Sequence, residues 1–173
     1  MGTRNLTKVI DKNGEIRVAQ YGQWDGYPSG QGVNMLSFIS EYKMLDKIEK
    51  ALVKCRFVSE GEMGAAYDVY SDEPKWEELR NDFQGYGIAF PSFSRDTATD
   101  ILKVIVYSNE EVILWDDREF ENDDLMCEGV YTLNYQTRTF ISTYNGVSVS
   151  IEFDRLPTAE EYLNSFEKLL TNP

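Results

Sequence analysis

The chain has 173 residues, a length typical of a single domain, and its 42% hydrophobic and 13% aromatic content excludes a disordered protein. The formal net charge of −13 is unevenly placed, because residues 1–56 carry nine Lys/Arg against six Asp/Glu and residues 57–173 carry eight against twenty-four. This excess of carboxylates repels nucleic acid. We therefore expect the acidic part to bind no DNA or RNA directly and to favour a basic protein surface as its partner.

Residues that the sequence lacks exclude several classes of site. Without histidine the chain cannot form a Ser-His-Asp or Cys-His site, and a zinc site is disfavoured, so we expect neither a metal nor a cofactor. No apolar run is long enough to span a bilayer, and the first residues lack the apolar region of a signal peptide. We therefore expect a cytoplasmic protein in which Cys55 and Cys127 are reduced, buried side chains.

The first half of the chain is predicted to form a hairpin followed by helices. Residues 4–10 and 15–21 are predicted strands, the second showing the alternation of a half-buried strand, and Asn13-Gly14 between them is a strong signal for a hairpin turn. Apolar residues at three- and four-residue spacing then predict helices. The expected helices span residues 33–42, 45–56, 74–80 and 94–106, the last one capped by Ser94 or Asp96.

The second half is predicted to be rich in strands. The expected strands span residues 112–115, 125–134, 137–144 and 147–153. Thr158 is expected to cap a final helix that ends near Leu170. This order predicts a single α+β domain over residues 1–173, with an N-terminal β-hairpin, central helices, C-terminal antiparallel strands and a final helix.

Residues 19–32, with the sequence AQYGQWDGYPSGQG, combine four glycines with three aromatic side chains. Glycine permits close backbone approach and aromatic rings offer rigid contact surface, so the loop suits two roles. It forms either a binding pocket or a structural plug, in which Trp24 and Tyr27 cover the core and Asp25 caps a turn. The glycine spacing fits neither a P-loop nor a Rossmann motif. The candidate binding residues are Arg4, Gln23, Trp24, Asp25, Tyr27 and Gln31.

A second candidate surface lies in the acidic stretch between residues 110 and 128, whose only cation is Arg118. The stretch suits a solvated loop, a mimic of a phosphate backbone that meets a basic groove, or a Mg²⁺ or Ca²⁺ site. Its spacing matches no EF-hand, so the order of preference is solvated loop, then mimic, then metal. The candidate residues of this surface are Asp116, Asp117, Glu119, Glu121, Asp123 and Asp124.

The N-terminus permits an enzymatic hypothesis. Removal of Met1 would leave the α-amine of Gly2 beside Thr3, and N-terminal-nucleophile hydrolases use such an amine as their base. Glycine carries no nucleophile, so an ordinary strand is the preferred interpretation of this segment.

The opening residues MGTRNLT and the loop AQYGQWDGYPSGQG together resemble a family of small proteins carried by phages, plasmids and bacterial genomes. Weaker matches are SRDT at residues 94–97 and CEGVY at residues 127–131. Small acidic proteins of mobile elements often inhibit bacterial defence, and the chain looks similar to a type II-A anti-CRISPR.

This resemblance implies protein–protein contact with Cas9 or its guide-RNA complex, and the basic channels of such effectors suit an acidic inhibitor. Two alternatives stay open. One is a hydrolase or nuclease-like enzyme that uses the N-terminal strand and the loop. The other is a binding module for a small metabolite.

Overall fold

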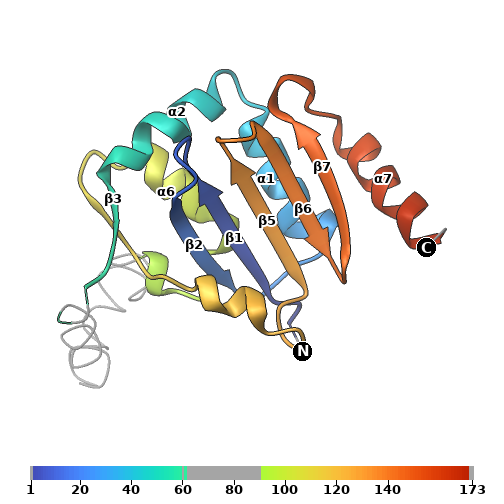
Figure 1. Cartoon of the computed structure of the whole chain (residues 1–173), viewed down its shortest axis with the longest axis horizontal. Coiled ribbons are helices and arrows are strands. Elements are labelled where there is room, and N and C mark those ends of the chain that lie inside the picture. Colours follow the sequence, from blue (N-terminus) through green and yellow to red (C-terminus); the bar gives the residue numbers. More distant parts are fainter. Residues whose placement is uncertain (1, 60, 62–90, 172–173) are drawn as a thin grey trace.

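The computed structural model describes residues 2–59, 61 and 91–171, and its centre is a five-stranded sheet (Figure 1). The order across the sheet is β2-β1-β5-β6-β7; β1 and β5 run parallel, and the other neighbours run antiparallel. The predicted α+β fold is confirmed. These strands are β1 (Asn5–Ile10), β2 (Ile16–Gly22), β5 (Gly129–Asn134), β6 (Thr139–Tyr144) and β7 (Val147–Glu152).

A second, smaller pair of strands lies beside the outer edge of β2. It consists of β3 (Cys55–Phe57) and β4 (Val112–Leu114), which run parallel. The chain leaves β4 and returns to β2 at once, because Asp116 forms a parallel bridge with Ala19. This return places the acidic stretch against the main sheet.

Helices cover one face of the main sheet. In the described part of the chain they are α1 (Val33–Ile39), α2 (Met44–Ala51), α6 (Ile101–Tyr107) and α7 (Ala159–Thr171). Figure 1 shows α1 and α6 behind the sheet, and α7 runs along β7. Alternate strand residues such as Val9, Val18 and Leu133 form the core with these helices, because successive side chains of a strand point to opposite faces.

Two local motifs, the cap of the last helix and the turn of the first hairpin, form as the sequence predicts. Thr158 Oγ1 accepts the N–H of Glu161 (3.2 Å), and the Glu161 carboxylate accepts the N–H of Thr158 (2.8 Å), which is a reciprocal capping box. In the first hairpin, Asp11 Oδ1 accepts the N–H groups of Asn13 (2.8 Å) and Glu15 (3.1 Å). Gly14 adopts φ 85°, the left-handed conformation that the turn requires.

The predicted ends of the first two helices are wrong. The helix expected over residues 33–42 ends at Ile39, and the one expected over residues 45–56 ends at Ala51. Cys55 enters β3 instead, where it pairs with Val112 and its carbonyl accepts a hydrogen bond from Arg17. Pairing with a distant strand thus overrides the helical spacing of the apolar residues.

Two further boundaries shift because a carboxylate has another partner. The helix expected from residue 94 begins with a short 3-10 turn at Ala98, since the Asp96 carboxylate accepts the Trp24 Nε1–H (2.8 Å) rather than capping a helix. The strand expected from residue 125 begins at Gly129, since Asp123 Oδ1 accepts the N–H groups of the next turn. The predicted helix over residues 74–80 lies outside the described residues.

Both cysteines are free thiols, as expected for a reduced protein. Cys55 is buried, whereas Cys127 is only half-buried, and burial raises the pKa of each thiol to about 11. Among the described helices, none combines the length and apolar character that a membrane span needs.

Candidate functional site

The loop of residues 20–32 is tied to the sheet through its backbone. The N–H of Gly26 donates to the Thr3 carbonyl (2.9 Å), and the Gly26 carbonyl accepts the hydroxyl of Tyr131 (2.7 Å). A Cβ at Gly26 would lie 2.7 Å from the Thr3 oxygen and 2.9 Å from the Arg4 oxygen. The glycine at this position therefore permits a close backbone approach.

The two central aromatic side chains of the loop do not plug the core. Trp24 and Tyr27 are each 45% exposed and contribute nothing to the core cluster. The Trp24 ring is fixed at its edge by the Asp96 carboxylate, and the Arg95 guanidinium lies 6.0 Å from its centroid. The Tyr27 ring lies 6.1 Å from the ring of Tyr144. Both rings are thus held in place while half of each faces solvent.

The two glutamines among the candidate binding residues hold the loop together. Gln31 Nε2 donates to the Trp24 carbonyl (3.3 Å), and Gln31 Oε1 accepts the Thr99 hydroxyl (2.5 Å). Gln23 Oε1 accepts the Tyr21 hydroxyl (2.6 Å). The polar ends of both side chains therefore already have partners within the protein.

Asp25 is exposed and adopts φ 54°, a left-handed conformation that is uncommon for residues other than glycine. Its backbone carbonyl accepts the N–H of Gln31 (2.8 Å), which closes the turn of residues 25–31 around Tyr27. The bond involves the backbone of Asp25 and not its side chain.

The acidic stretch is packed on the sheet and is not the freely solvated loop that the sequence favours. Residues Arg118–Asn122 form a 3-10 helix. Phe120 meets Tyr21 edge to face at 4.8 Å, and the Glu121 carboxylate pairs with Lys8 of β1 (2.5 Å). The stretch therefore has a second cation, supplied by the sheet, besides its own Arg118.

Asp117 anchors the stretch to β2 with two hydrogen bonds. Its N–H donates to the Ala19 carbonyl (3.0 Å), and its carboxylate accepts the N–H of Tyr21 (3.1 Å). Burial raises the pKa of Asp117 to about 6; the Tyr21 N–H partly offsets this, and the neighbouring charge of Asp116 adds to it. The carboxylate is therefore partly protonated in mildly acidic solution.

The remaining carboxylates of the stretch differ in their partners. Asp116 pairs with Arg118 (2.7 Å), and Asp123 Oδ1 accepts the N–H groups of Leu125 and Met126. Glu119 accepts the side-chain amide of Asn122 (3.1 Å), and Asp124 is exposed. Only part of the candidate acidic surface is therefore free of a structural role.

Both candidate surfaces meet at the lower end of the sheet, close to the N-terminus (Figure 1). Arg4 lies at the junction, because its guanidinium donates to the Met126 sulfur and its backbone N–H to the Glu128 carboxylate (3.4 Å). Burial raises the pKa of Tyr21 while the positive charge of Arg4 lowers it, which places Arg4 near the Tyr21 hydroxyl as well. Arg4 thus links the acidic stretch to the strand that leads into the loop.

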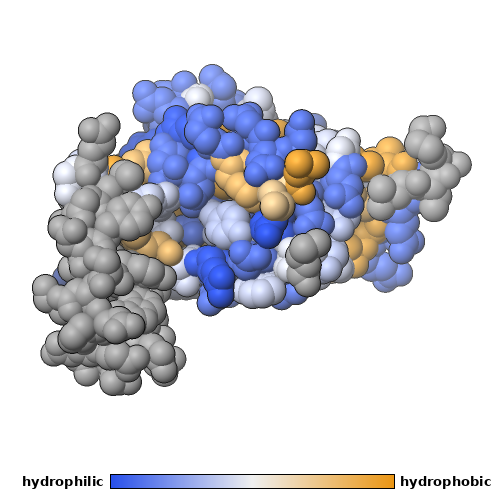
Figure 2. All heavy atoms as spheres, turned by 90° about the horizontal axis from the view of Figure 1, so that it is seen from below, coloured by the Kyte–Doolittle hydropathy of each residue, from blue (hydrophilic) through white to orange (hydrophobic). Residues whose placement is uncertain are grey.

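Exposed apolar side chains gather around this junction. Leu125 is 90% exposed and Met126 43% exposed, in addition to the half-exposed rings of the loop. Seen from below, small hydrophobic patches lie between hydrophilic side chains (Figure 2). We call the set the basal patch; it comprises Arg4, Trp24, Tyr27, Leu125 and Met126.

Sequence reasoning missed Leu125 and Met126 because it placed both in a strand. Asp123 could have indicated a turn at these residues, since the Asp side chain commonly accepts backbone N–H groups in turns. In the part of the chain that the structure describes, no three His, Cys, Asp or Glu side chains are placed to hold a metal ion together.

Comparison of the chain with protein-family models, curated protein sequences and solved structures finds no match.

Proposed function

We propose that the protein is an inhibitor of bacterial defence of the anti-CRISPR kind, encoded by a mobile element and acting in the bacterial cytoplasm. Its target is Cas9 or the Cas9–guide-RNA complex, which it contacts as one protein contacts another. The basal patch makes the contact, and the adjacent acidic stretch approaches a basic surface of the target.

The observation that carries this proposal is the composition of the basal patch. Rigid aromatic rings, Met and Arg are the side chains most enriched in protein interfaces. Here Trp24, Tyr27 and Met126 are 43–45% exposed, and Arg4 is half-buried with its guanidinium against Met126. Trp24 is held at its edge by Asp96, so little conformational entropy is lost when its open face meets a partner. Isolated exposed apolar residues need no explanation, but a cluster next to a strongly charged segment favours an interface.

An enzyme that uses the N-terminal strand is the alternative. The N-terminal-nucleophile mechanism of such an enzyme needs an accessible amine and an accessible nucleophile at the start of the chain. Thr3 is only 6% exposed, and a Cβ at Gly2 would lie 2.5 Å from the Trp24 ring. The ring thus lies against the segment that the enzyme would use, which favours a contact surface over N-terminal-nucleophile chemistry.

Binding and inhibition measured with purified components test the proposal. The full chain is titrated against immobilised Cas9 with and without guide RNA, and DNA cleavage is followed in parallel. We expect saturable binding to at least one of the two forms and loss of cleavage at stoichiometric protein. Absence of binding to both forms contradicts the proposal, and cleavage of guide RNA by the protein alone with Mg²⁺ supports the enzyme.

A further inference from the structure

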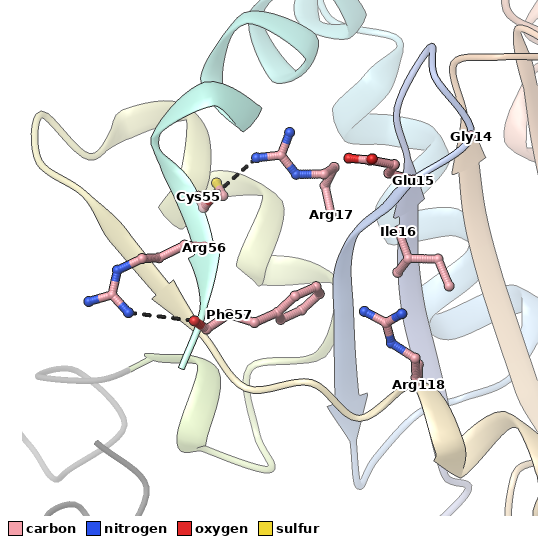
Figure 3. A pocket seen from close by; sticks show the side chains of 8 residues that line it. All are labelled: Gly14, Glu15, Ile16, Arg17, Cys55, Arg56, Phe57 and Arg118. Atoms are coloured by element: carbon pink, nitrogen blue, oxygen red, sulfur yellow. Dashed lines mark hydrogen bonds between the residues drawn. The ribbon is translucent and has the colours of Figure 1, made fainter. Parts of the chain in front are cut away.

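A hollow of about 730 Å³ lies between the beginning of β2 and the small pair β3–β4 (Figure 3). Its volume falls in the range of small-molecule sites, which is roughly 300–1,000 Å³. The described residues that line it are Gly14, Glu15, Ile16, Arg17, Cys55, Arg56, Phe57 and Arg118. The guanidinium groups of two of these arginines, Arg17 and Arg118, face the hollow, although the net charge of the chain is −13.

A β-bulge aims Arg17 at this hollow. Val9 faces Val18 across the hairpin, but Ile10 faces Ile16, so Arg17 is the extra residue of β2. Bulges re-aim side chains and are common beside functional sites. The Arg17 guanidinium donates to the carbonyls of Leu52 (3.0 Å) and Cys55 (3.1 Å), which fixes its position at one wall.

Arg118 reaches the hollow from the opposite wall. Asp116 holds its guanidinium through two contacts (2.8 and 2.7 Å), and the guanidinium lies 5.2 Å from the centroid of the Phe57 ring. Figure 3 shows Arg17 above and Arg118 below, with Phe57 and Ile16 between them, while Arg56 points away on the outer side of β3. The hollow therefore has two cationic walls and an apolar middle.

The carboxylates that pair with these arginines do not line the hollow. Asp11 approaches Arg17 (3.5 Å) and Asp116 holds Arg118, and both carboxylates lie outside the lining. Glu15 is the one anionic side chain among the described lining residues. A guanidinium that is already held by a carboxylate is preorganised, and its remaining N–H groups suit a planar oxyanion.

The geometry points to a binding site for a small organic oxyanion: a carboxylate or phosphate group carried on a planar, apolar body. The oxyanion pairs with the Arg118 guanidinium, and the planar body packs on Phe57 and Ile16 towards Arg17. The site uses no residue of the basal patch, but it shares Arg118 and the Asp116 that holds it with the acidic stretch. The titration below uses the protein without Cas9, so its outcome does not depend on the proposed function.

Calorimetric titration of the full chain at low salt tests the site with three probes. AMP carries a phosphate on a ribose that also bears a planar base, benzoate carries a carboxylate directly on a ring, and inorganic phosphate carries no planar body. We expect AMP or benzoate to bind with a dissociation constant below about 1 mM and inorganic phosphate to bind more weakly. If neither AMP nor benzoate binds, or if inorganic phosphate binds as tightly as both, the ligand class is wrong.

Three variants assign the binding to the hollow. Arg118→Gln should weaken the tighter probe about tenfold, because it removes one charge-assisted hydrogen bond. Glu15→Gln should strengthen it about threefold, because it removes the anionic lining residue. Arg138→Gln is the matched control, since Arg138 pairs with Asp154 at another place on the surface. Amide chemical shifts of Phe57 and Arg17 provide a second readout that does not depend on the variants.

The pattern across the variants decides the assignment. Opposite effects of Arg118→Gln and Glu15→Gln, with no effect of Arg138→Gln and with shifts at Phe57 and Arg17, support the site. If Arg118→Gln and Arg138→Gln bind the tighter probe with equal affinity, and the probe leaves the amide chemical shifts of Phe57 and Arg17 unchanged, the site is overturned.

Discussion

The loop of residues 20–32 and residues 116–124 of the acidic stretch both lie against the main sheet, but they are attached in different ways. The loop is attached largely through its backbone, as the bonds of Gly26 to Thr3 and Tyr131 show. The acidic stretch is attached largely through the side chains of Asp117, Phe120 and Glu121, which contact β2 and β1. In the first region, the exposed faces of Trp24 and Tyr27 are therefore available for a partner. In the second region, most side chains are engaged in the fold.

This difference separates stability from function residue by residue. In the loop, a change at a glycine should damage the fold and a change at an exposed ring should spare it. In the acidic stretch, a change at an anchoring carboxylate should alter stability, and only the outer carboxylates should act on association alone. The following predictions test this separation, starting with the largest effect.

Gly26→Ala should lower the free energy of unfolding by about 2–3 kcal/mol, because the added methyl group would lie against the backbone oxygens of Thr3 and Arg4. Chemical denaturation followed by tryptophan fluorescence measures the change. Gly61→Ala is the control, since a Cβ there would meet no atom of the described residues within 4 Å. Equal losses in the two variants would show that the loop is not held by this close approach.

Asp117→Asn should raise stability at pH 7.5 by about 1 kcal/mol and leave it nearly unchanged at pH 4. The folded pKa of about 6 lies above the unfolded value of 3.8, so the folded state binds more protons between these values. Stability therefore falls as pH rises through this window, and asparagine, which still accepts the Tyr21 N–H, removes that fall.

Denaturant unfolding at the two pH values measures the effect of this substitution. Asp124→Asn is the control. Because Asp124 is exposed, this substitution should change stability by the same amount at both pH values. A pH dependence that persists unchanged in Asp117→Asn would mean that this carboxylate is not the group responsible.

The double change Glu119→Gln with Asp124→Asn should leave stability within about 0.5 kcal/mol of the parent. If the target surface is basic, association with the Cas9–guide complex should slow about two- to threefold at low salt, because exposed charges act mainly on the association rate. Stopped-flow or biosensor kinetics at two salt concentrations measure this. If the double variant associates as fast as the parent at both salt concentrations, the outer carboxylates do not steer binding.

The sequence predicts those parts of the fold that depend on neighbours along the chain. The Asn13-Gly14 turn and the Thr158 capping box form as expected, because both motifs satisfy their hydrogen bonds within a few residues. The parallel pairing of β1 with β5 follows from no local pattern, since it joins Asn5 to Gly129. Long-range pairing also explains why Cys55 lies in a strand and not in the predicted helix.

The candidate site shows the same limit. Composition identifies the loop as unusual, but the exposure of Trp24 depends on Asp96, which lies 72 residues further along the chain. The hollow beside β2 escapes prediction because it needs the bulge at Arg17 and the return of Arg118 to the edge of β2. The functional hypothesis itself stays a prediction.

The most direct test of the central claim is the dissociation constant of the Trp24→Ala variant for the Cas9–guide complex. Tyr42→Ala is the control, because Tyr42 is an 80% exposed aromatic residue between α1 and α2 and is not part of the basal patch. If the basal patch is the interface, Trp24→Ala should raise the dissociation constant at least about tenfold while Tyr42→Ala leaves it unchanged. Both proteins should stay folded by circular dichroism. Parental affinity in folded Trp24→Ala would contradict the account.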